Sequence, residues 1–71
     1  MSKQIEKIRA KLQDIQDELE TLAEKKQDYY DNRSEAWQES DKASEMEDEI
    51  SAYEDAASSV GDAIDYLEDY V

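Results

Sequence analysis

The chain has 71 residues, of which 21 are acidic and 8 are basic, and its formal net charge is −13 at pH 7. It contains no Cys and no His, which excludes disulfides, Cys/His zinc sites and catalytic Cys–His pairs. The negative charge disfavours direct binding to nucleic acid or to an anionic membrane, and it favours a basic protein partner.

The first segment is predicted to form one long helix over residues 3–38. Ser2 is a candidate N-cap, the chain has no Pro, and its single Gly is Gly61. Lys26 and Arg33 fall on the apolar seam of this helix, where their aliphatic stems can pack. The seam alternates steps of three and four residues through Ile5, Ile8, Leu12, Ile15, Leu19, Leu22, Lys26, Tyr29, Arg33 and Ala36.

A second helix is predicted over residues 45–70, after a short polar connection. Ser44 followed by Glu47 matches a capping box. An acidic disordered tail would lack an apolar repeat, whereas this segment keeps one throughout. Its seam is Met46, Ile50, Tyr53, Ala57, Val60, Ile64, Leu67 and Val71.

Two helices with facing seams and a short connection predict an all-α fold, an antiparallel two-helix hairpin that forms a single domain. Counting outward from the turn places Leu22 near Val60, and the first helix then extends roughly 15 Å beyond the second. The alternatives are a longer continuous coiled coil and a chain that becomes ordered only on its partner.

Two helices of this size cannot enclose a core, so we expect self-association into a four-helix bundle or coiled coil. The predicted overhang leaves Ile5 and Ile8 without a partner inside the hairpin. Leu12 follows them on the seam, and Gly61 would allow a close approach of helices. These four residues are the predicted oligomerisation site.

Beyond Lys42 the chain has no basic residue but ten carboxylates. They give about one charge per 4 Å of helix axis, close to the roughly 3.4 Å spacing of a single nucleic-acid strand. Tyr66 and Tyr70 lie among these acids and could anchor a basic surface. The candidate partner-binding residues are Glu47, Asp48, Glu54, Asp55, Asp62, Asp65, Tyr66, Glu68, Asp69 and Tyr70.

No catalytic residue, cofactor or metal site is predicted, and we expect a protein that is not an enzyme. Residues 28–39 have acids at both ends, like a calcium-binding loop. Arg33 stands where such a loop needs Gly, however, and Tyr30 stands where it needs an oxygen ligand. Trp37 is expected to cover the turn end of the hairpin, with contact to a partner as the alternative.

The stretch Arg33-Ser34-Glu35-Ala36-Trp37-Gln38-Glu39-Ser40 resembles one found in small acidic helical accessory proteins of bacteriophages and prophages. The resemblance implies action in the bacterial cytoplasm, and often inhibition of a host enzyme or defence system by DNA mimicry. The absence of Cys also fits a reducing cytoplasm, and the sequence shows neither the apolar run of a signal peptide nor a membrane span.

These observations support two main hypotheses. The first is a phage-type inhibitor that presents its acidic helix to the basic groove of a host nucleic-acid-binding or defence protein, such as a nuclease or CRISPR effector. The second is a structural or adaptor coiled coil whose acidic face only increases solubility. A third possibility, an oligomer that sequesters a signalling ligand, has no direct support in the sequence.

Overall fold

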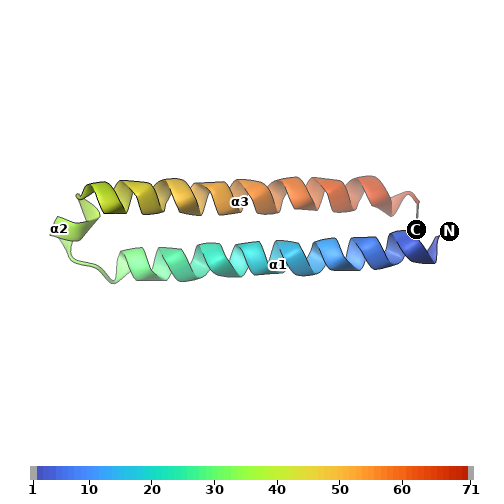
Figure 1. Ribbon diagram of the computed structural model, residues 1–71, viewed down its shortest axis with the longest axis horizontal. Coiled ribbons are helices and arrows are strands. Elements are labelled where there is room, and N and C mark those ends of the chain that lie inside the picture. Colours follow the sequence, from blue (N-terminus) through green and yellow to red (C-terminus); the bar gives the residue numbers. More distant parts are fainter. Residues whose placement is uncertain (1, 71) are drawn as a thin grey trace.

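The computed structural model describes residues 2–70, which form three helices: α1 (Lys3–Asp31), α2 (Glu35–Gln38) and α3 (Asp41–Glu68). The long helices α1 and α3 lie side by side and run in opposite directions, and α2 is a single turn of helix in the connection between them (Figure 1). The molecule measures 55 × 15 × 11 Å. The predicted all-α class is confirmed.

A serine begins each of the three helices. The hydroxyl oxygens of Ser2, Ser34 and Ser40 accept hydrogen bonds from the backbone N–H groups three residues later. Such caps satisfy N–H groups that have no partner inside the helix. Each first turn also carries a carboxylate, which interacts favourably with the positive end of the helix dipole.

The predicted helix boundaries at the turn were wrong. The first helix ends at Asp31 and not at residue 38. Just after this end, the Asn32 side chain donates a hydrogen bond to the Asp28 carbonyl at 2.9 Å. The second long helix begins at Asp41 and not at residue 45. The predicted capping box was therefore also wrong, because Ser40 is the N-cap and Ser44 lies inside α3.

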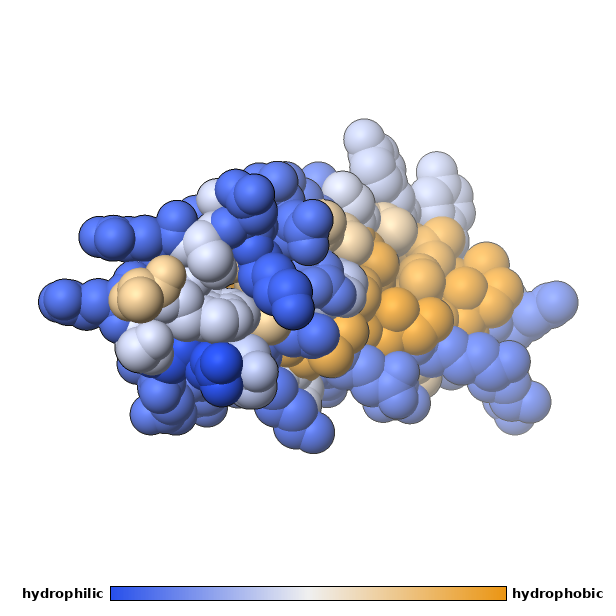
Figure 2. All heavy atoms as spheres, turned by 60° about the vertical axis from the view of Figure 1, so that its left-hand side comes forward, coloured by the Kyte–Doolittle hydropathy of each residue, from blue (hydrophilic) through white to orange (hydrophobic). Residues whose placement is uncertain are grey.

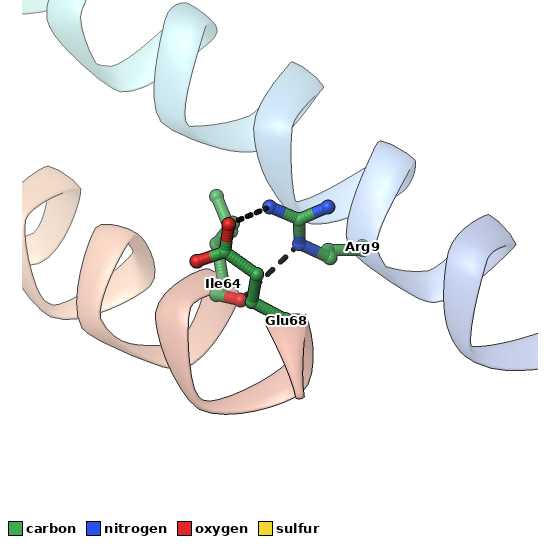
Figure 3. A network of polar contacts seen from close by, with 3 residues as sticks. All are labelled: Arg9, Ile64 and Glu68. Carbon is green, nitrogen blue, oxygen red and sulfur yellow. Dashed lines mark hydrogen bonds and ion pairs between the residues drawn. The ribbon is translucent and has the colours of Figure 1, made fainter. Parts of the chain in front are cut away.

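Contacts between α1 and α3 set their register. Gln16 Nε2 donates to the Ala57 carbonyl at 3.1 Å, and Arg9 Nε donates to the Ile64 carbonyl at 3.3 Å. Figure 3 shows Arg9 reaching from α1 to this carbonyl and to Glu68, whose carboxylate lies 3.9 Å from Arg9 Nη2. These contacts connect the end of α3 to the start of α1.

This register differs from the predicted one by about two helical turns, because the turn lies earlier in the chain. Gln16 faces Ala57, so the predicted pairing of Leu22 with Val60 was wrong. The two long helices have 29 and 28 residues. The predicted overhang of the first helix is therefore absent.

The core between α1 and α3 is thin. Its buried side chains are mostly small, and four of the five come from every seventh residue of α3. They are Ala23, Ala43, Ile50, Ala57 and Ile64. The remaining side chains that face the partner helix are only half-buried, among them Arg9, Gln16 and Lys26 of α1.

An aromatic cluster lies at the turn. Trp37 of α2 packs edge-on against Tyr29 and Tyr30, with ring centroids 5.7 and 5.8 Å apart. The Arg33 guanidinium lies over the rings of Tyr29 and Trp37, at 5.4 and 5.2 Å from their centroids. Gln38 Nε2 donates to the carbonyls of Tyr30 and Arg33, which ties α2 back to the end of α1.

Candidate functional site

One row of carboxylates projects into solvent from α3 and its C-cap. Its members recur every seventh residue, all are exposed, and none takes part in the two ion pairs found among residues 2–70. These carboxylates are therefore not engaged by a basic side chain of the described residues. This aspartate row consists of Asp48, Asp55, Asp62 and Asp69.

The neighbouring row of glutamates lies closer to α1. The Tyr30 hydroxyl donates to Glu47 Oε1 at 2.6 Å, and Glu68 pairs with Arg9. The hydrogen bond to Glu47, with smaller effects from burial and nearby charge, raises the pKa of Tyr30. Glu54 lines a shallow groove with Glu20 and Ala23 of α1. Two of these three glutamates thus already have partners within the chain.

The two tyrosines near the end of α3 are the most exposed of the large apolar side chains. Tyr66 is 78% exposed and Tyr70 67% exposed. They line a shallow depression together with Asp62, Asp65 and Asp69. The structure therefore places together the predicted tyrosines and three of the predicted acids.

A groove at the turn gathers positive charge, and the sequence analysis missed it. Four of the eight basic residues line this groove, which has a volume of about 770 Å³. Lys26 Nζ forms an ion pair with Glu49 Oε1 at 3.7 Å. The seven-residue spacing of Lys26 and Arg33 was the available signal, because it places both side chains on one face of a helix. Lys42 belongs to α3, and its place in this groove depends on how the chain turns. The turn groove is lined by Leu22, Lys25, Lys26, Tyr29, Arg33, Trp37, Lys42, Glu45, Met46 and Glu49.

An apolar face runs along one side of both long helices. On α1 it consists of every seventh residue, and these side chains are 40%, 45%, 37% and 49% exposed: Ile8, Ile15, Leu22 and Tyr29. On α3 the half-buried residues with the same spacing are Met46, Tyr53, Val60 and Leu67. Leu22, Tyr29 and Met46 line one groove, which shows that the two series meet on the same side. Figure 2 shows apolar side chains gathered in a band along the molecule.

The predicted oligomerisation residues lie in different environments. Ile8 belongs to the apolar face, whereas Ile5 and Leu12 are half-buried. Gly61 is also half-buried, and a Cβ at this position would lie 2.6 Å from Gln16 Nε2 of the same chain. The close approach at Gly61 in this structure is therefore a contact between α1 and α3.

No family model, curated protein or solved structure matches this chain. Within residues 2–70, no helix combines the length and apolar character needed to cross a membrane. The same residues contain no cluster of three or more potential metal ligands. The described surface carries exposed carboxylates and exposed apolar side chains.

Proposed function

We propose that this protein is a non-enzymatic binding protein whose α3 helix competes with nucleic acid for the basic groove of another protein. The aspartate row carries this proposal, because its four carboxylates are exposed and have no ion-pair partner within the described chain. A phage-type inhibitor of a host nucleic-acid-binding or defence protein is the setting that we favour.

The spacing of charge supports this function. Ten carboxylates along α3 give about one charge per 4 Å, similar to the roughly 3.4 Å spacing of phosphates along one strand. Self-association of two helical hairpins into a four-helix bundle is part of the proposal, since it would display two such helices. Tyr66 and Tyr70 would add apolar contact at one end of the charged surface.

Competition with labelled DNA tests the proposal. Purified basic DNA-binding proteins are mixed with fluorescent duplex DNA, and release of the DNA is followed by anisotropy as this protein is added. We expect release that weakens steeply with salt, because charges at the rim of an interface are screened beyond about 10 Å at 0.1 M.

Three substitutions in the aspartate row, Asp55→Asn, Asp62→Asn and Asp69→Asn, should slow association and abolish the competition. The matched control neutralises three exposed carboxylates of α1 instead: Asp14→Asn, Asp17→Asn and Asp28→Asn. Both variants change the net charge equally, so only a site on α3 predicts different results. Equal competition by the two folded variants would contradict the proposal.

The exposed apolar face favours a second candidate, a structural or adaptor coiled coil. In this function the acidic residues would only increase solubility, and binding would survive high salt. Retention of a captured partner at 1 M NaCl, together with loss of capture on Leu22→Asp, would identify this alternative.

A further inference from the structure

The single chain leaves an unusually large surface exposed. Its solvent-accessible area is 5481 Å². A compact monomer of 8.2 kDa is expected to expose about 4500 Å². The excess is therefore roughly 1000 Å², and a standard protein interface buries about 800 Å² on each partner.

The composition of the core indicates the same need for a partner. Three of the five buried apolar residues are alanines, while larger side chains on the apolar face remain exposed to water. Apolar area contributes to stability in proportion to the area removed from water. Covering Ile15, Leu22 and Tyr29 would give this chain the core that its own two helices do not provide.

We propose that a second copy of this chain covers the apolar face, with the turns of both copies at the same end. The dyad axis then runs along the length of the molecule, and α1 of one copy packs on α3 of the other. This inference specifies the self-association proposed above, and it does not depend on the function of the aspartate row.

Rotation about a dyad along the long axis leaves the position of every residue along that axis, here called its height, unchanged. Residues that are level within one chain, as Gln16 and Ala57 are, are therefore also level between chains. The exposed residues of α1 then meet the apolar residues of α3 in the second copy at every heptad. The expected pairs are Ile8 with Leu67, Ile15 with Val60, Leu22 with Tyr53, and Tyr29 with Met46.

Charge selects this orientation over the opposite one. With the turns together, Lys25 of one copy lies near the height of Glu49 in the second copy, and both residues line the turn groove. With the turns at opposite ends, α1 packs on α1, and Lys25 then lies opposite Lys11 of the second copy. Opposite charges favour the first arrangement, and like charges disfavour the second.

Sedimentation equilibrium of the purified chain tests the interface. The wild type should be a dimer of twice 8.2 kDa at micromolar concentration. Ile15→Asp places a charge in the apolar face and should give a monomer. Ala10→Asp adds the same charge at another exposed position of α1 and should remain dimeric. A monomeric wild type, or a dimeric and folded Ile15→Asp variant, would overturn the proposal.

The orientation is tested by reversing the charge of Lys25, a substitution that leaves the apolar face intact. Lys25→Glu should raise the dissociation constant about two- to thirtyfold, the range expected for the two exposed ion pairs that the dyad creates. The opposite orientation predicts that Lys25→Glu strengthens the dimer, because it removes the repulsion from Lys11.

Because the chain has no Cys, a single Glu35→Cys variant can carry a spin label in α2. Turns at the same end predict a short distance between the two labels. A distance approaching the 55 Å length of the molecule would refute the orientation while leaving the dimer itself established. Neither result bears on competition with DNA.

Discussion

Gln16 of α1 and Gly61 of α3 lie against each other where the two helices run side by side. The Gln16 amide occupies the space above the glycine, with Nε2 2.6 Å from the point where a Cβ would stand, and it donates to the Ala57 carbonyl at 3.1 Å. The missing side chain of Gly61 thus makes room for a polar contact that sets the register.

Gly61→Ala should have opposing effects that nearly cancel. Replacing a glycine inside a helix stabilises it by about 1 kcal/mol. The Gln16 side chain must then move away and loses a hydrogen bond worth about 0.5–1.5 kcal/mol. We expect the free energy of unfolding in urea to change by less than about 0.5 kcal/mol, as these two effects partly offset each other.

In a Gln16→Ala background the Gln16 amide is absent and no hydrogen bond is lost. The same Gly61→Ala substitution should then stabilise the folded protein by the full amount, about 1 kcal/mol. The difference between the two backgrounds is the coupling energy of a double-mutant cycle. Identical effects in both backgrounds would show that Gln16 and Gly61 do not interact.

Ser40→Ala should destabilise the protein by about 1 kcal/mol, because Ser40 caps α3. Ser44→Ala is the matched control, since Ser44 lies inside the same helix, where Ala is the better helix former. Urea titrations followed by circular dichroism give both free energies. A larger loss for Ser44→Ala would support the capping box predicted from the sequence.

Stability should fall at high pH because two tyrosines, Tyr30 and Tyr53, lose their protons. Hydrogen bonds to Glu47 and Glu49, followed by burial, raise the pKa values of Tyr30 and Tyr53 above the usual value of 10.0. A raised pKa in the folded state stabilises the protein below about pH 10 and loses this contribution as the pH rises through the folded pKa.

Thermal melts between pH 8 and pH 11.5 measure this loss. The double variant Tyr30→Phe/Tyr53→Phe should show a shallower decline than the wild type. The control variant Tyr66→Phe/Tyr70→Phe removes two exposed hydroxyls and should decline like the wild type. Parallel curves for all three proteins would contradict the assignment to Tyr30 and Tyr53.

Added salt should stabilise the fold. A net charge of −13 opposes compaction by self-repulsion, and dissolved ions screen this repulsion. We expect the melting temperature to rise by several degrees between 10 mM and 500 mM NaCl, at constant protein concentration. The triple Asp55→Asn, Asp62→Asn, Asp69→Asn variant should respond less. A melting temperature that falls with added salt would be incompatible with this explanation.

The helical class could be predicted from the sequence because both heptad repeats are long and keep their spacing without a break. The end of α1 could not be predicted from periodicity, since Lys26, Tyr29, Arg33 and Ala36 continue the repeat into the turn. The local signal was ambiguous: Ser34 and Ser40 are each followed directly by an acid, as an N-cap often is, but so is Ser44, which lies inside α3.

The sequence also did not predict which residues of the α1 seam are exposed and which are covered by α3. The apolar stripe of α1 is wider than its contact with α3, so Leu12 is half-buried whereas Ile15 is exposed. Which edge of the stripe faces α3 depends on where the chain turns. The aspartate row was predictable because it needs only the helical repeat, whereas the turn groove required the position of Lys42 relative to α1.

The contacts between the helices join residues at steadily increasing separations along the chain. Tyr30 contacts Gln38 and Glu47, at separations of 8 and 17 residues, whereas Gln16–Ala57 and Arg9–Ile64 span 41 and 55 residues. Closing a short loop costs less entropy than closing a long one. Folding should therefore start at the aromatic cluster around Trp37, and α1 and α3 should join from there toward the other end. The cluster, which at first sight only closes the turn, would thus decide the order in which the whole molecule assembles.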